Sequence, residues 1–195
     1  MTRATKEDLS KLEHLMGYIK LTKERKLFIR VTQECDMQIH AFIDVALALH
    51  HNSKSHSGVI ITVGGVVVYV SSGKQGCMTK SPTESELVAY SDKLGLVELF
   101  HEFVCFLVGR PVALSIVYQD STSLISLVTR GGGVTRTKHL RARMNLVKES
   151  LELRRSLVLW LHTKEMPADG ASKVLEGKAQ KAYADFVLGV VSFNG

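Results

Sequence analysis

Hydrophobic residues alternate with polar ones, or run together for a few positions, in five segments of strand composition. These segments are residues 38–44, 57–63, 66–70, 112–118 and 157–161. A polar loop over residues 46–58 separates the first two segments. Gly64 and Gly65 join the second and third, and a glycine pair between β-branched runs predicts a two-residue hairpin turn. The first three strands are therefore expected to pair in antiparallel fashion.

Elsewhere the hydrophobic residues recur every three or four positions, which indicates amphipathic helices. Helices are predicted over residues 5–20, from Ser81 towards Gly109, over 121–129, over 138–154 and from about Pro167 onward. The clearest start is at Ser81, an N-cap residue that is followed by Pro82 in the first turn and by Glu84 in the position of a capping box.

The order of these elements favours an α/β fold. It predicts a mixed five-stranded sheet, with three antiparallel strands followed by two parallel strands, and with helices on its faces. The two parallel strands are reached through helical crossovers. A chain of 195 residues is long enough for one domain of ordinary size with an appendage.

Composition narrows the class without deciding the function. Hydrophobic residues make up 45% of the chain and charged residues 23%, which is typical of a globular protein. The net charge of +6 is compatible with a polyanionic partner but is weak evidence alone. Cys35, Cys77 and Cys105 are widely spaced, which favours reduced thiols over a disulfide framework or a zinc site. The sequence shows neither an apolar signal segment nor a membrane span, so an intracellular protein without a membrane partner is expected.

Four acidic residues occupy positions where a sheet and its helices could bring them together. Asp44 ends the first strand, and Asp120 ends the strand expected beside it in parallel. Glu86 and Asp169 lie in the first turns of two helices. Ligands bind α/β sheets at the carboxyl ends of adjacent parallel strands. Oxygen ligands without histidine or cysteine suit Mg²⁺ or Mn²⁺, and two such ions about 4 Å apart support in-line attack on a phosphodiester.

Each acid also has a simpler interpretation. An aspartate at a strand end is usually a turn residue, and Asp169 near a helix start could serve the helix dipole or its cap. Glu86 could lie on a solvated helix face. Glu84 is explained by its place in the capping box.

Short motifs are spread across residues 38–175. They are Asp44-Val-Ala-Leu-Ala, Lys54-Ser-His-Ser-Gly58, Tyr69-Val-Ser-Ser-Gly-Lys-Gln75, Ser81-Pro-Thr-Glu-Ser-Glu-Leu87, Val117-Tyr-Gln-Asp-Ser121, Arg136-Thr-Lys-His139 and Glu165-Met-Pro-Ala-Asp-Gly-Ala-Ser-Lys173. These motifs resemble those of ribonuclease H domains from copia-type retrotransposons. The corresponding family motifs read Asp-Ala-Asp-Trp-Ala, Arg-Lys-Ser-Thr-Ser-Gly, Trp-Ser-Ser-Lys-Lys-Gln, Ser-Thr-Thr-Glu-Ala-Glu-Tyr, Tyr-Cys-Asp-Asn, Arg-Thr-Lys-His and Glu-Gln-Leu-Ala-Asp-Ile-Phe-Thr-Lys. Each motif is short, but together they occur in the family's order and at compatible spacings.

The resemblance implies a ribonuclease H-like fold and a hydrolase that cuts the RNA strand of RNA/DNA hybrids during reverse transcription, with two Mg²⁺ or Mn²⁺ ions. Carried over position by position, the family's metal-binding acids fall on Asp44, Glu86, Asp120 and Asp169. His139 matches a motif position that suits proton transfer or contact with the scissile phosphate, although a helix-capping role is a close alternative. The residues expected to contact nucleic acid are Lys54, Ser55, Ser57, Ser72, Lys74, Arg136, Lys138 and Arg141.

The stretch Tyr18-Ile-Lys-Leu-Thr22 belongs to a segment, residues 5–31, that resembles the end of the upstream reverse transcriptase region. This implies a division into a reverse transcriptase segment over 1–31 and a ribonuclease H domain over 32–190. The reverse transcriptase portion of the same polyprotein is then an expected partner. The resemblance also implies a cytoplasmic location, including virus-like particles, with the nucleus as the alternative.

The sequence departs from the family at positions that do not carry the presumed metal ligands. Ala46 and Leu47 replace an aspartate and a tryptophan, Arg141 replaces an aspartate, and Asn145 replaces a histidine found in many members. These departures indicate a divergent element. They leave open a second function, a catalytically inactive module that holds hybrid for an attached reverse transcriptase. A third, a nuclease or resolvase of the same fold that acts on DNA, is disfavoured by the motifs outside the acids.

Overall fold

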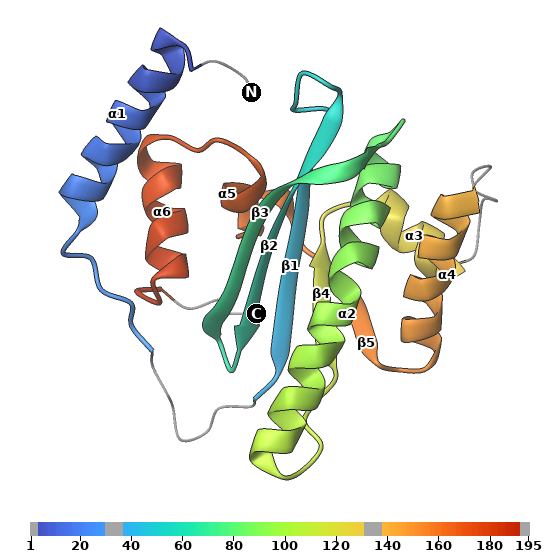
Figure 1. The fold of residues 1–195 in the computed structure, drawn as a ribbon. Helices are drawn as coiled ribbons and strands as arrows, with labels where there is room; N and C mark the ends of the chain where they lie inside the picture. The colour runs from blue at the N-terminus through green and yellow to red at the C-terminus, as the bar shows by residue number, and fades with distance from the viewer. Residues whose placement is uncertain (1–3, 30–36, 131–137, 192–195) are drawn as a thin grey trace.

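A computed structural model describes residues 4–29, 37–130 and 138–191, and its centre is a five-stranded sheet (Figure 1). The strands are β1 (Ile39–Ala46), β2 (Lys54–Val63), β3 (Val66–Met78), β4 (Ser115–Gln119) and β5 (Ser156–Trp160). They lie in the order β3-β2-β1-β4-β5. β1 pairs antiparallel with β2, which pairs antiparallel with β3, while β4 is parallel to both β1 and β5. The predicted mixed sheet is confirmed.

Helices cover both faces of this sheet (Figure 1). They are α1 (Lys6–Thr22), α2 (Pro82–Val108), α3 (Thr122–Arg130), α4 (Lys138–Glu152), a 3-10 turn (Thr163–Glu165), α5 (Asp169–Ser172) and α6 (Gly177–Val187). α2, α3 and α4 pack on one face in a core that includes Ile43 of β1 and Leu87 of α2. The opposite face carries a smaller core of Phe42 and Ile60, with Phe186 of α6 packed against it. β1 is therefore buried on both sides, as a central strand should be.

Several element boundaries differ from the sequence prediction. β2 begins at Lys54, inside the expected loop, and β3 continues to Met78, because the hairpin pairing extends to Lys54 opposite Met78. β4 begins three residues later than the expected strand and ends one residue later, so it is shorter. The last helix is divided into α5 and α6, since Lys173 adopts an extended conformation after α5. The glycine pair behaves as predicted, with positive φ angles of 55° and 80° at the hairpin turn.

The start of α2 keeps the predicted N-cap but not the complete capping box. The Ser81 hydroxyl accepts a hydrogen bond from the backbone N–H of Glu84 at 3.3 Å. The Glu84 carboxylate accepts from the backbone N–H of Lys80, at 2.8 Å, instead of from Ser81. The glutamate therefore reaches one residue further back than the motif requires, and it still satisfies a free N–H before the helix.

α1 lies at the edge of the fold beside α6 (Figure 1), and Tyr18 and Thr22 at its C-terminal end line a hollow with residues of α6. Its capping box between Thr5 and Asp8 is complete, yet none of its residues is buried. Its apolar residues at helical spacing form a stripe that is about half exposed at each position, Leu9, Leu12, Met16 and Ile19. The chain contacts the body of the fold again after α1, where the backbone N–H of Phe28 donates to the carbonyl oxygen of Leu188 at 2.8 Å.

Within the described ranges, no helix has both the length and the apolar character needed to cross a bilayer. Cys77 and Cys105 are free thiols, and Cys35 lies outside the described residues.

Candidate active site

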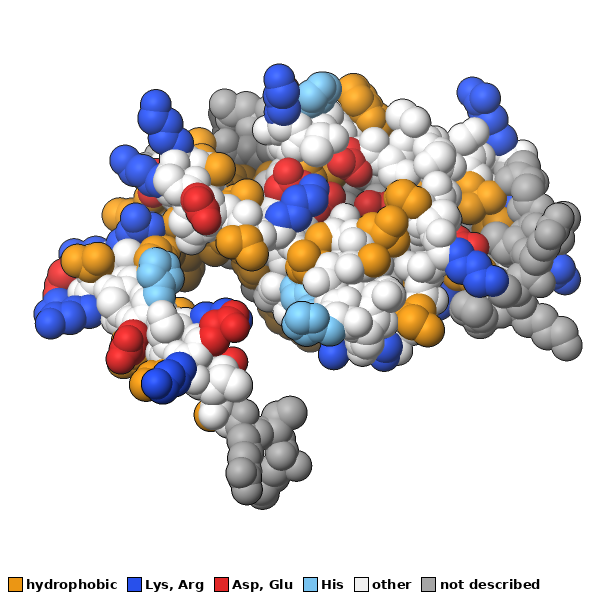
Figure 2. Space-filling model, turned by 90° about the horizontal axis from the view of Figure 1, so that it is seen from above, with side chains coloured by type: hydrophobic (Ala, Val, Ile, Leu, Met, Phe, Trp, Pro, Cys, Tyr) orange, Lys and Arg blue, Asp and Glu red, His pale blue; other side chains and the backbone are white. Residues whose placement is uncertain are grey.

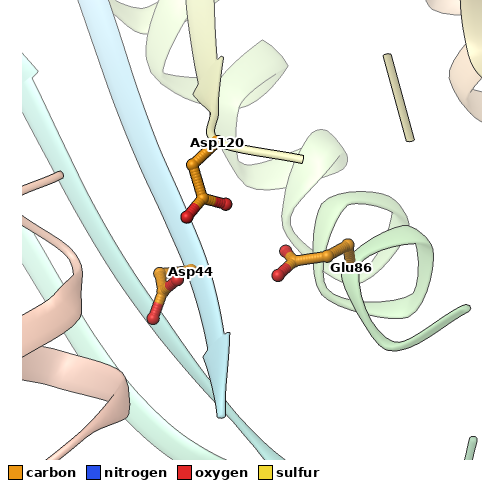
Figure 3. A group of neighbouring side chains, drawn as sticks. All are labelled: Asp44, Glu86 and Asp120. Carbon is orange, nitrogen blue, oxygen red and sulfur yellow. The ribbon is translucent and has the colours of Figure 1, made fainter. Parts of the chain in front are cut away.

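Three of the predicted acids meet at one edge of the sheet. Asp44 lies near the end of β1, and Asp120 directly follows β4, the parallel neighbour of β1. Glu86 reaches them from the second turn of α2. One carboxylate oxygen from each residue lies within 4.8 Å of the others, and Figure 3 shows the three side chains turned toward a common space. The parallel pairing of β1 with β4 thus produces the arrangement that strand order alone predicted.

The fourth acid, Asp169, is near this group but is not a member of it. α5 carries Asp169 and packs against β1 and β2 on the sheet face opposite α2. Asp169 consequently approaches the cluster from the side of Asp44. A single point of convergence for all four carboxylates, as expected from the sequence, is not what the structure shows. Three carboxylates converge, and the fourth adjoins Asp44.

Gly58 allows α5 to come this close. It pairs with Asp44 across the β1–β2 ladder. A Cβ atom at Gly58 would lie 2.5 Å from the backbone nitrogen of Ser172 and 2.6 Å from the carbonyl oxygen of Ala168. Both are backbone atoms, which cannot turn aside as a side chain could. The backbone of α5 therefore rests directly on β2 at a position that only glycine leaves free.

α5 and the residue after it supply the hydrogen bonds of Asp44, whose exposed fraction is only 1%. The Ser172 hydroxyl donates to Asp44 Oδ2. The ammonium of Lys173 lies 3.2 Å from Asp44 Oδ2 and 2.7 Å from Asp169 Oδ1, so it bridges the two carboxylates. Figure 2 shows acidic side chains gathered around a basic one in a depression on this side of the molecule. A buried carboxylate without such partners would be costly.

Asp120 is held by the last residue of β5 and by the segment that follows this strand. The Thr163 hydroxyl donates to Asp120 Oδ2 at 2.9 Å. The indole N–H of Trp160 donates to the backbone carbonyl of Asp120 at 3.2 Å. The side chain and backbone of Asp120 are thereby fixed from two neighbouring positions, and its second carboxylate oxygen can still turn toward Asp44 and Glu86.

Glu86 is the least satisfied of the acids. Its exposed fraction is 7%, and its Oε2 atom has no hydrogen-bond partner among the described residues. Burial, reinforced by the charges of Asp44 and Asp120, raises the pKa of Glu86 to about 9. The backbone just before it is held by buried Gln75, whose side-chain amide donates to the carbonyl oxygen of Ser85 at 2.9 Å. A bare, buried carboxylate oxygen that faces two other carboxylates is suited to a cation.

The pKa values of Asp169 and Lys173 are also shifted by burial and by neighbouring charges. Burial raises the pKa of the Asp169 carboxyl, and the neighbouring Asp44 adds to this effect, whereas Lys173 opposes it. Burial acts to lower the pKa of Lys173, but the hydrogen bond to Asp169 and the charge of Asp44 outweigh it and raise the pKa. Lys173 is therefore charged at neutral pH. The donor set consists of carboxylate oxygens, which fits a hard divalent ion such as Mg²⁺ or Mn²⁺.

Replacement of Glu86 by glutamine should change how stability depends on pH. The unfolded chain releases the Glu86 proton near pH 4.5 and the folded protein near pH 9, so the free energy of unfolding of the metal-free protein falls as pH rises between these values. Glu86→Gln removes this contribution. At pH 8 the variant should be more stable than the parent by about 1 kcal/mol or more, which corresponds to about 2–4 °C in melting temperature.

The measurement is thermal unfolding at pH 5 and pH 8 in a chelating buffer. Glu102→Gln, at an exposed position of the same helix, is the matched control and should show no such gain. An equal pH dependence for the parent and Glu86→Gln would contradict the assigned burial of Glu86.

The structure separates the expected nucleic-acid-binding residues into two groups. Lys74 and Ser72 are exposed on β3, and the Ser72 hydroxyl lies 2.8 Å from Nε2 of His56. Lys54 and Ser57 are half-buried: the Lys54 ammonium donates to the carbonyl of Gly76, and the Ser57 hydroxyl accepts from Gln75. The first group is open to a phosphate, whereas the second is already engaged within the hairpin.

The prediction for Ser55 requires a correction. Its side chain is fully buried, and its hydroxyl accepts from the backbone N–H of Ala48 and lies 3.3 Å from the Thr79 hydroxyl. A buried hydroxyl has no surface to offer to a phosphate. Ser55 stabilises the turn between β1 and β2 instead.

The basic cluster around residues 136–143 is only partly described. Arg136 lies outside the described residues, as do the side chains of Lys138 and His139 at the start of α4. Arg141 is exposed on α4. Arg143 points inward, where it forms an ion pair with Asp92 and donates to the Ser91 hydroxyl at 2.7 Å. It therefore joins α4 to α2 and is not available to a ligand.

Three residues of the site were not predicted as functional from the sequence. Ser172 and Lys173 contact Asp44, and Thr163 contacts Asp120. Lys173 had a detectable signal, because it closes a matched motif and lies four residues after Asp169. Ser172 and Thr163 had none, since their roles depend on how distant segments fold together.

The fold is that of ribonuclease H. It resembles LC11 ribonuclease H1, isolated from compost by a metagenomic approach, with a TM-score of 0.52 and 18% identity over 69% of this chain and 92% of that one. A crystal structure of LC11 ribonuclease H1 in complex with an RNA/DNA hybrid gives a TM-score of 0.51 and 15% identity, over 69% of this chain and 93% of that one. At these identities the likeness establishes the fold alone.

In sequence, the chain is similar to part of a retrotransposon Pol polyprotein. It is 32% identical over 124 residues to the retrovirus-related Pol polyprotein from transposon TNT 1-94 of Nicotiana tabacum. The match covers 64% of this chain but only 9% of the polyprotein, so the chain corresponds to a small part of that relative. A scan of protein-family models gave no match. The resemblance inferred from the motifs, to the ribonuclease H region of a retrotransposon polyprotein, is confirmed.

Proposed function

We propose that this protein is a metal-dependent ribonuclease H that hydrolyses the RNA strand of RNA/DNA hybrids. The observation that carries the proposal is the group of Asp44, Glu86 and Asp120, in which a buried Glu86 oxygen without a partner faces two other carboxylates. Three acids from three elements, placed at one edge of a ribonuclease H fold, form a site for a divalent ion. The ribonuclease H fold supports the same activity.

In the proposed site, Asp44, Glu86 and Asp120 would hold a Mg²⁺ or Mn²⁺ ion, and Asp169 with Asp44 would hold a second. Bound divalent ions supply an activated water and stabilise the leaving oxygen of a phosphodiester. The protein's own residues orient this chemistry. Thr163 fixes the Asp120 carboxylate, and Ser172 fixes that of Asp44. Glu86 must release its proton before it can serve as a ligand, so metal affinity should rise with pH up to about 9.

Recognition of the hybrid is proposed to rest on phosphates and 2′-hydroxyl groups, not on base sequence. Ser72 and Lys74 on β3 and Arg141 on α4 are exposed and support this role. LC11 ribonuclease H1 has been crystallised with an RNA/DNA hybrid, so an RNA/DNA hybrid is the first nucleic acid to test as a substrate. Arg136, Lys138 and His139 remain proposed contacts, with His139 also proposed to transfer a proton or to contact the scissile phosphate.

We further propose that the domain acts in the reverse transcription of a copia-type element. Residues 32–190 would form the nuclease, and residues 1–31 would continue from the reverse transcriptase of the same polyprotein. The exposed apolar stripe of α1 agrees with such a connection. The proposed place of action is the cytoplasm, within virus-like particles.

The test is cleavage of an RNA/DNA hybrid labelled at one end of its RNA strand. With Mg²⁺ or Mn²⁺ the protein should shorten the labelled RNA, and with a chelator it should not. DNA duplex of the same sequence is the control for a DNA-directed nuclease. A protein that binds the hybrid but cuts nothing with either ion would be an inactive binding module, and the proposed activity would be wrong.

A further inference from the structure

The two sides of the acidic site differ in what already occupies them. On the α2 side, Asp44, Glu86 and Asp120 face one another, and the Glu86 oxygen there has no partner. On the α5 side, the space between Asp44 and Asp169 is taken by the ammonium of Lys173. The site is therefore not a symmetric pair of cation positions.

We propose that Lys173 is a resident cation that fills the second cation position, so that the protein without nucleic acid binds one divalent ion and not two. This inference rests on the proposed metal site and adds to it a defined stoichiometry and a residue that sets it. The ion binds at Asp44, Glu86 and Asp120. A second ion must displace the ammonium from Asp44 and Asp169.

The contacts of Lys173 explain why the ammonium holds this position. Its Nζ atom lies 2.7 Å from Asp169 Oδ1 and 3.2 and 3.4 Å from the two oxygens of Asp44. Among the described residues, no other basic side chain forms an ion pair with the acids of the site. Asp44 is nearly inaccessible to water, so loss of this ion pair would leave a buried charge dependent on the Ser172 hydroxyl alone.

The backbone of Lys173 is held in place by hydrogen bonding within α5 and by the contact of α5 with β2. Its backbone N–H donates to the carbonyl of Asp169, and α5 is pressed onto β2 at Gly58. The contact between the backbones of α5 and β2 at Gly58 therefore positions Lys173 together with its two carboxylate partners, Asp44 and Asp169. An ammonium held by two carboxylates competes with a cation for the same oxygens.

The test counts bound Mn²⁺ ions in the protein without nucleic acid, by electron paramagnetic resonance of free Mn²⁺ and by calorimetric titration. The parent should bind one ion per chain. Lys173→Gln should bind a second ion, with an affinity gain of about tenfold or more, because a competing positive charge has been removed. Lys173→Arg keeps the charge and should still bind one. Lys178→Gln, an exposed lysine of α6, controls for the change in net charge.

The outcomes separate this inference from the proposed function. Two ions bound by the parent with equal affinity would overturn the role of Lys173 and leave the nuclease intact. If folded Lys173→Gln binds the same number of Mn²⁺ ions as the parent, the role of Lys173 is likewise overturned. If the parent binds no Mn²⁺ and Asp44→Asn behaves identically, the metal site itself is wrong and both proposals fall. The count in the parent is informative even if Lys173→Gln does not fold.

Discussion

Asp120→Asn should abolish cleavage of the hybrid while leaving its binding almost unchanged. The amide keeps the shape of the side chain, and its oxygen can still accept the hydrogen bond from Thr163. What the change removes is one negative charge from the group that would hold a divalent ion. Loss of that ligand should lower the cleavage rate by ~10³ or more, at about 1.4 kcal/mol for each factor of ten.

The experiment compares single-turnover cleavage and binding affinity for the parent, Asp120→Asn and Asp185→Asn. Asp185 lies on α6, so its replacement makes the same chemical change away from the acids and should have little effect. Binding by all three proteins should weaken with salt, since it depends on lysine and arginine side chains that neutralise phosphates. If the parent cuts and Asp120→Asn cuts at the same rate, the metal-site assignment cannot stand.

Gly58→Ala should destabilise the domain and disable the site together. The added Cβ would meet backbone atoms of Ser172 and Ala168 at 2.5 and 2.6 Å, so α5 has to move. Overpacking of this kind costs about 1–3 kcal/mol, or about 2–12 °C in melting temperature for a chain of this size. Displacement of α5 also carries Lys173 and Asp169 away from Asp44, so cleavage should fall even where the protein remains folded.

Gly73→Ala is the matched control for this prediction. Gly73 lies on β3, and a Cβ there would meet nothing within 4 Å. Thermal unfolding and hybrid cleavage would be measured for both variants below their melting temperatures. Equal melting temperatures and equal activities for Gly58→Ala and Gly73→Ala would show that α5 does not depend on this close approach.

The sheet could be predicted from the sequence because its signals are local. The glycine pair at 64–65 set the hairpin, and the long helix before β4 required a parallel return beside β1. Asp44 and Asp120 followed from that return, since they end neighbouring parallel strands. The boundaries of β2 and β3 were less accurate, because pairing between the hairpin arms continues through polar residues that resemble a loop.

The arrangement around α5 could not be predicted in the same way. Asp169 was expected to converge with the other acids, but α5 lies on the sheet face opposite α2 and reaches the group beside Asp44. Lys173 bridges two acids only because the backbone of α5 contacts β2 at Gly58. The burial of Ser55 depends on a turn that folds over it. These features arise from tertiary contact, which no short stretch of sequence encodes.

The contact of Lys173 with Asp44 joins residues that are 129 positions apart in the chain. Ribosomes add about 5–20 residues per second, so some 6 to 26 s separate the synthesis of the two partners. Until the later residue emerges, β1 can form but Asp44 has neither its hydroxyl donor nor its ammonium. A nascent chain therefore contains the sheet before it contains a complete site, and nuclease activity should appear only after translation has passed α5.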